Sequence, residues 1–141
     1  MAEKKFVVAY DGSAHAKKAL EWAVDLAQKL SAEIFIVTVS ERTLHHLEES
    51  YHLIELEKQY HQKFVEEAEE GKTLCEKQGV VAHADVLEGH PADEVIKYAR
   101  KQKADLIVSG TRGLGGFGQL LLGSVAHKLV TYSDTPVVIV K

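Results

Sequence analysis

Several features that would assign this 141-residue chain to a particular compartment are scarce or missing. Its only cysteine, Cys75, has no second cysteine in the chain with which to form a disulfide. The longest apolar run near the N-terminus, residues 6–10, is far too short for a signal peptide or a membrane span. These absences predict a cytoplasmic protein that does not associate with membranes.

Blocks of basic residues are also missing, and the formal net charge is −4 at pH 7. A protein whose main task is to bind nucleic acid needs a basic face that neutralises phosphates. The acidic balance therefore predicts that nucleic acid is not a partner.

The common phosphate-binding motifs are absent or weak. No Gly-Lys-Ser or Gly-Lys-Thr occurs, which excludes a P-loop of the form GxxxxGK[ST]. Gly113, Gly115 and Gly118 do spell GxGxxG. A dinucleotide-binding fingerprint, however, follows a first strand and needs an acidic residue about twenty positions later, whereas here the chain is nearly finished.

What is present is the composition and alternation of an ordinary soluble domain. Hydrophobic residues make up 45% of the chain and charged residues 27%. A chain of this length predicts one domain, residues 1–141, that buries roughly two thirds of its unfolded surface. Short apolar runs predict buried strands at residues 5–10, 34–39, 80–87, 105–109 and 136–140. Amphipathic helical patterns lie between them, which predicts the α/β class with a parallel five-stranded sheet.

The loop after the fourth predicted strand is the most unusual stretch. Five of the ten glycines lie between Gly110 and Gly118, and the loop runs on to Gly123 and Ser124. Glycine lets main-chain amides approach a ligand closely, and a helix that begins at Ser124 would add its first amides and the positive end of its dipole. This arrangement predicts a phosphate site. The alternative is a plain glycine connector with Ser124 as a helix cap.

Other candidate residues have structural explanations of their own. Asp11 or Ser13 would cap the first helix, and capping explains both as well as a ligand contact does. In the last helix, Val125, Ala126, Leu129 and Val130 are predicted to face inward.

The segment from residue 42 to residue 78 predicts one long amphipathic helix after a polar connector. Its histidines, His45, His46, His52 and His61, do not form an HxxxH or HExxH pair, so a metal site is disfavoured. Cys75 lies on the apolar stripe and is predicted to be a buried small hydrophobe.

Three motifs together resemble the universal stress protein family, in the subgroup that binds ATP. They are the spacing Gly110-x2-Gly113-x9-Gly123-Ser124, the sequence VAYDGS at residues 8–13 and TPVVIVK at residues 135–141. The resemblance covers essentially the whole chain. It implies an open, doubly wound, Rossmann-like sheet of order 3-2-1-4-5, and an ATP-binding stress-response or signalling module. Gly118 departs from the basic residue more usual in this part of the family's loop.

The resemblance also implies a site for ATP, or for ADP or AMP. Asp11 would lie beside the ribose and phosphates, and the backbone of Val39 would meet the adenine edge. A carboxylate next to phosphate repels it unless a divalent cation intervenes, so Mg²⁺ at Asp11 is implied. The implied nucleotide-binding residues are Ala9, Tyr10, Asp11, Val39, Gly110, Thr111, Arg112, Gly113, Gly123, Ser124 and Val125.

The last predicted strand also indicates a partner. An apolar strand at a sheet edge tends to aggregate unless it is paired, which predicts a homodimer through Val137, Val138, Ile139 and Val140. A client protein is a further partner for a signalling module.

Two other functions fit parts of the sequence. One is a slow ATPase or an adenylate-handling enzyme, for which Arg112 and Lys128 would supply charge although no residue stands out to orient water. The other is a receiver domain, which Asp11 and Lys141 fit in part. It would need an aspartate after the third strand, where Glu88 stands.

Overall fold

The computed structural model describes residues 3–41, 51–112 and 122–141, the side chains of residues 51–53 excepted. Strands and helices alternate along these residues. In chain order they are β1 (Lys5–Ala9), α1 (Ala14–Leu30), β2 (Glu33–Ser40), α2 (Tyr51–Lys77), β3 (Ala82–Glu88), α3 (Pro91–Gln102), β4 (Leu106–Gly110), α4 (Ser124–Tyr132) and β5 (Val137–Val140).

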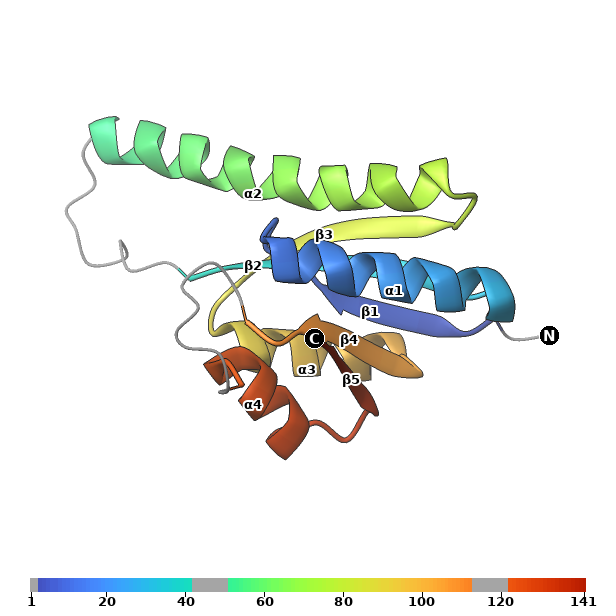
Figure 1. Ribbon diagram of the computed structural model, residues 1–141. Helices are drawn as coiled ribbons and strands as arrows, with labels where there is room; N and C mark the ends of the chain where they lie inside the picture. The colour runs from blue at the N-terminus through green and yellow to red at the C-terminus, as the bar shows by residue number, and fades with distance from the viewer. Residues whose placement is uncertain (1–2, 42–50, 113–121) are drawn as a thin grey trace.

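The strands form a five-stranded sheet of order β3-β2-β1-β4-β5, and every neighbouring pair is parallel. Figure 1 shows α1 and α2 above this sheet and α3 and α4 below it. The predicted α/β class, the doubly wound parallel sheet and the strand order 3-2-1-4-5 are confirmed.

The central strands are apolar throughout because both of their faces are covered. Val8 and Ile36 face α1 and α2, whereas Val7 and Val37 face α3 and α4. All four are at most 1% exposed. Strands buried on both faces read as continuous hydrophobic runs, which is why these segments are recognisable in the sequence.

The long helix α2 differs from its prediction at its start. The side chains of Leu56 and Tyr60 continue the apolar stripe but are 55% and 46% exposed. In Figure 1 the first turns of α2 extend past the ends of the strands, so no sheet lies beneath them. Cys75, farther along, is fully buried as predicted, and burial raises the pKa of its thiol to about 12. It serves as a small apolar residue.

The last helix, α4, buries fewer residues than predicted. Ala126 and Leu129 are buried and Val125 packs against the core on the α3 side. The prediction for Val130 is wrong, because its side chain is 54% exposed. This short helix packs on α3 and on the edge strand β5, so only a narrow arc of its surface is covered.

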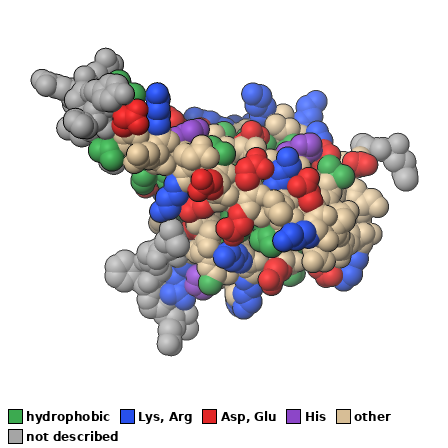
Figure 2. Space-filling model, turned by 90° about the horizontal axis from the view of Figure 1, so that it is seen from above, with side chains coloured by type: hydrophobic (Ala, Val, Ile, Leu, Met, Phe, Trp, Pro, Cys, Tyr) green, Lys and Arg blue, Asp and Glu red, His purple; other side chains and the backbone are tan. Residues whose placement is uncertain are grey.

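The face formed by α1 and α2 carries charges of both signs. Figure 2 shows Lys and Arg side chains interspersed with Asp and Glu side chains there, without a large patch of one sign. None of the helices within the described residues combines the length and the apolar character needed to cross a membrane.

Candidate functional site

The predicted site lies where the strand order changes direction. The chain passes from β1 to β2 on one side, and β4 pairs with β1 on the other. In open α/β sheets, ligands bind in the crevice outside the carboxyl ends of two such strands. Residues 10–13 follow β1 and residues 111–112 follow β4, so both segments lie at this edge.

Tyr10, the first residue after β1, is fixed by the protein itself. Its side chain is 2% exposed, and its hydroxyl donates a hydrogen bond to the Glu70 carboxylate at 2.8 Å. Burial, and secondly this bond, raise the pKa of Tyr10 well above its ordinary value. The Thr38 hydroxyl donates to the Tyr10 carbonyl at 2.8 Å. The Tyr10 amide donates to the Val37 carbonyl at 2.9 Å, so the hydroxyl, the carbonyl and the amide of Tyr10 are all engaged within the protein.

Asp11 and Ser13 build the start of α1. Ser13 is the N-cap, and its hydroxyl accepts a hydrogen bond from the Ala16 amide at 3.1 Å. Asp11 accepts one from the Ser13 amide at 2.9 Å through Oδ1. The predicted capping role is confirmed for Ser13. The bond from Ser13 uses one of the two carboxylate oxygens of Asp11.

Carboxylates from α2 gather over the start of α1. Gly12 has φ of +77°, and a Cβ added there would lie 3.6 Å from the Glu67 carboxylate. Burial, and to a lesser degree the charges of Asp11 and Glu70, raise the pKa of Glu67, while Lys63 lowers it. The start of α1 is thus an acidic environment. No group of three or more His, Cys, Asp or Glu that could hold a metal occurs within the described residues.

The end of β4 packs directly on the first turn of α1. A Cβ added at Gly110 would lie 2.8 Å from the carbonyl oxygen of His15, a distance that a side-chain carbon does not tolerate. The hydroxyl oxygen of the next residue, Thr111, is 3.5 Å from Nδ1 of His15. Position 110 therefore requires glycine, because a side chain there would clash with α1. Neither Glu67 nor His15 was predicted, because each lies in an amphipathic helix whose pattern does not mark it.

The other end of the glycine loop returns to Thr111. The Gly123 amide donates to the Thr111 carbonyl at 2.7 Å. A Cβ added at Gly123 would lie 2.9 Å from that carbonyl oxygen and 3.3 Å from Cα of Arg112. Of the predicted glycine spacing, Gly123 thus joins the two ends of the loop, and Gly110 packs the first end against α1. Gly113 lies outside the described residues.

Helix α4 begins at Ser124, as predicted, with Gly123 as its N-cap. Glycine has no side chain, and the cap makes no side-chain hydrogen bond. The first intrahelical bond runs from the His127 amide to the Gly123 carbonyl at 2.9 Å. The amides of Ser124, Val125 and Ala126 consequently have no acceptor within the helix, and the helix dipole adds positive potential there. This is the geometry of an anion site.

The predicted adenine end lies on the other side of β1. Ala9 and Val39 are partly buried against the core on the α3 side, and the pairing of β1 with β2 stops at Ala9 and Val37. Val39 is therefore beyond the end of that ladder. The next residue, Ser40, is 2% exposed, and its hydroxyl has no hydrogen-bond partner among the described residues.

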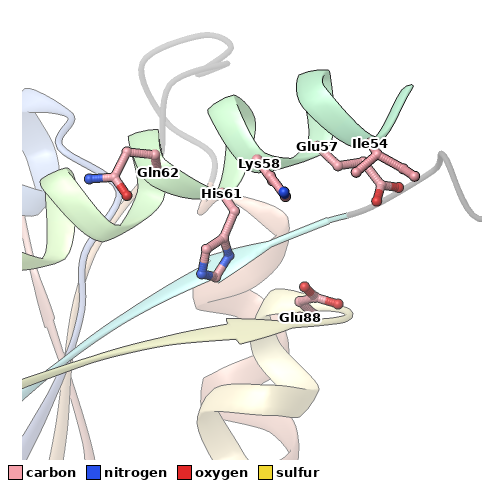
Figure 3. Close-up of a pocket in the computed structure, with 6 residues that line it drawn as sticks. All are labelled: Ile54, Glu57, Lys58, His61, Gln62 and Glu88. Carbon is pink, nitrogen blue, oxygen red and sulfur yellow. The ribbon is translucent and has the colours of Figure 1, made fainter. Parts of the chain in front are cut away.

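A separate hollow lies under the overhanging start of α2. It encloses about 480 Å³ and is lined by Ile54, Glu57, Lys58, His61, Gln62 and Glu88. Figure 3 shows His61 extending from α2 towards the end of β3, where Glu88 stands. None of the predicted nucleotide-binding residues lines it. Its lining carries charges of both signs, so it is less suited to binding a phosphate group than the start of α4 is.

Comparison with known proteins identifies the family. The universal stress protein family matches residues 3–141. The chain belongs to this family. Among curated relatives, universal stress protein MJ0531 of Methanocaldococcus jannaschii is 39% identical over 142 residues, which cover 98% of this chain and 82% of that protein.

Solved structures agree with the fold of this universal stress protein. The hypothetical protein MJ0577 superposes with a TM-score of 0.81 at 26% identity, over 100% of this chain and 97% of that one. A universal stress protein solved in complex with cAMP gives a TM-score of 0.74 at 26% identity, over 99% and 98% of the two chains. That relative binds an adenine nucleotide.

Proposed function

We propose that this universal stress protein is an ATP-binding stress-response or signalling module, with ADP or AMP as alternative ligands. The observation that carries the proposal is the start of α4, where Gly123 leaves the first helical amides without a side-chain cap. Nucleotide binding at this point would order the residues next to the glycine loop and alter a surface for a client protein. In this role ATP is a ligand rather than a substrate.

The order of the strands supports the placement of the nucleotide. The ends of β2, β1 and β4 follow one another along the sheet edge. The adenine would lie near Val39 and Ala9, the ribose near Asp11, and the phosphates at Thr111 and the amides of Ser124 and Val125. Gly110, Arg112 and Gly113 would complete the phosphate end. Binding of cAMP by a relative supports an adenine nucleotide as the ligand class.

Mg²⁺ would accompany a nucleotide triphosphate at this site. Proteins hold Mg²⁺ through one or two carboxylates together with substrate phosphates, rather than through a cage made only of protein groups. Asp11 fits this role because the Ser13 amide bonds to only one of its two carboxylate oxygens, Oδ1. The cation would offset the repulsion between Asp11 and the phosphates.

Mass spectrometry of small molecules released from the purified protein tests the ligand, and calorimetry with and without Mg²⁺ tests the site. We expect ATP to bind, and Asp11→Ala to weaken binding about tenfold in the presence of Mg²⁺. In its absence the same variant should bind ATP slightly more tightly than wild type, because the carboxylate that repels the phosphates is gone. Lys18→Ala, on the exposed side of α1, serves as the control. Failure of every adenine nucleotide to give heat would refute the proposal.

We also propose a homodimer through β5, whose residues Val137–Val140 are all only half-buried. The Ile107 amide donates to the Pro136 carbonyl, so the ladder to β4 continues through Val138, and the Ile139 amide faces the open edge. Ile139→Pro removes that donor and should give monomers in sedimentation experiments. Ile139→Thr loses apolar surface but keeps the amide, and it should still dimerise. A monomeric wild-type protein at micromolar concentration would contradict the dimer.

A further inference from the structure

His15 is the side chain of α1 that meets the beginning of the glycine loop. Its backbone carbonyl would lie 2.8 Å from a Cβ at Gly110, so the strand end and the helix are closer than any residue with a side chain would allow. Its ring nitrogen Nδ1 lies 3.5 Å from the hydroxyl oxygen of Thr111. Both residues are partly exposed, so the contact lies at the edge of the crevice rather than in the core.

Thr111 is held at two points. The Gly123 amide donates to its carbonyl at 2.7 Å, and its hydroxyl faces His15. A chain of contacts therefore runs from the first turn of α1, through Thr111, to the N-cap of α4. The Thr111 hydroxyl thus contacts His15 of α1, while the Thr111 carbonyl bonds to the residue that caps α4.

We propose that His15 is a positioning residue for the phosphates of the nucleotide, acting through Thr111. The Nδ1–H group of His15 donates to Oγ1 of Thr111, and the Thr111 hydroxyl donates its own hydrogen to a phosphate oxygen. A hydroxyl has one hydrogen and two lone pairs, so it can accept from the imidazole and still donate to the ligand. With the opposite tautomer, the hydroxyl would donate its hydrogen to the imidazole and would have none left for the phosphate. This inference depends on the proposed nucleotide site.

A purely structural role for His15 predicts different behaviour. If His15 only fills space beside Gly110, a leucine of similar bulk would replace it and an asparagine would serve worse. If His15 acts as a donor to Thr111, asparagine would replace it, because its side-chain amide carries an N–H group near the position of Nδ1. Leucine would then fail.

The test measures the affinity of the full-length protein for ATP and for adenosine in His15→Asn, His15→Leu, Thr111→Val and the double variant His15→Leu/Thr111→Val. We expect Thr111→Val, which loses a hydrogen bond to phosphate, to weaken ATP binding at least about tenfold. His15→Leu, which loses only the bond that orients the Thr111 hydroxyl, should weaken it about fivefold. His15→Asn should stay within about twofold of wild type. In the double variant His15→Leu should add almost nothing, because the two residues act through one contact.

Adenosine and the control Lys18→Ala complete the design. Adenosine has no phosphate, so its affinity should be equal in all variants, and Lys18→Ala should bind ATP as wild type does. The role of His15 would be overturned, with the proposed function left intact, by any of three results. These are equal losses for His15→Asn and His15→Leu, additive losses in the double variant, or a matching loss for adenosine. Absence of ATP binding by the wild type would instead overturn the proposed function, and this inference with it.

Discussion

Helices α1 and α4 begin at the same edge of the sheet, after the neighbouring strands β1 and β4, but their first turns are completed differently. The start of α1 is capped by the Ser13 hydroxyl and lies among carboxylates, with Glu67 standing over Gly12. The start of α4 has Gly123 as its cap and no acidic residue in its first turn. One helix start has a side-chain cap and carboxylates beside it, and the other, without either, is open to an anion.

Helix α3 provides a third case at the same edge. Its first position is Pro91, which has no amide hydrogen, and Asp93 and Glu94 stand in its first turn. These carboxylates complement the positive end of the helix dipole and repel an added anion. Residues that stabilise a helix start therefore also close it to phosphate. Among the described helices that begin at this edge, α4 is best suited to bind one.

The largest expected effect comes from giving α4 a cap like that of α1. Gly123→Asp would place a carboxylate against the amides of Val125 and Ala126, where it would accept their hydrogen bonds and repel a phosphate. We expect ATP affinity to fall at least about 100-fold, which corresponds to two lost charge-assisted hydrogen bonds of about 1.5 kcal/mol each. Isothermal calorimetry in the presence of Mg²⁺ measures this loss.

Gly123→Ala is the matched control for that variant. Its Cβ meets the same crowding, 2.9 Å from the Thr111 carbonyl oxygen, but it adds neither a cap nor a charge. The difference between the two variants isolates the electrostatic effect. Equal losses for alanine and aspartate would mean that crowding alone disrupts the site, and the contrast between the two helix starts would lose its support.

A smaller effect is expected at the capped helix. Ser13→Ala removes the acceptor of the Ala16 amide, and Ser13 is only 6% exposed, so water replaces it poorly. We expect the free energy of unfolding to fall by about 1 kcal/mol in urea titrations, while ATP affinity changes less than about twofold. Lys18→Ala, one turn away on the exposed side, should leave both unchanged. A tenfold loss of ATP affinity in Ser13→Ala would show that α1 also takes part in phosphate binding.

The sequence pattern is sufficient for the architecture because strands such as β1 and β2 are covered on both faces, which leaves a continuous apolar signal. The strand order, by contrast, was implied by the family resemblance and not by periodicity. Periodicity also failed at Leu56 and Tyr60, since a stripe continues along a helix whether or not a sheet lies beneath it. The start of α4 at Ser124 was predictable because the glycine loop ends there.

Parts of the candidate site depend on tertiary contacts that leave no local signal. His15 and Thr111 are 96 positions apart, and nothing in the pattern of α1 distinguishes His15 from other polar residues of an amphipathic helix. Glu67 likewise sits among many charged residues of α2. The roles of Gly110 and Gly123 as close backbone contacts were consistent with the predicted glycine loop, but the atoms that they approach are known only from the fold.

The smallest expected effect tests the acidic surroundings of α1. Burial raises the pKa of Glu67, so the folded state binds a proton at this carboxyl more readily than the unfolded chain does. The stabilising contribution is therefore present when Glu67 is protonated and is lost as the pH rises through its folded-state pKa. Glu67→Gln, which stays neutral, should give a slightly higher urea midpoint than wild type at pH 7, and this gain should shrink as the pH falls to about 4. Glu66→Gln, on the exposed side of α2, should give no such pH-dependent gain. A lower midpoint for Glu67→Gln at pH 7 would mean that its attraction to Lys63 outweighs the cost of burial, and that the carboxylates around α1 stabilise its start.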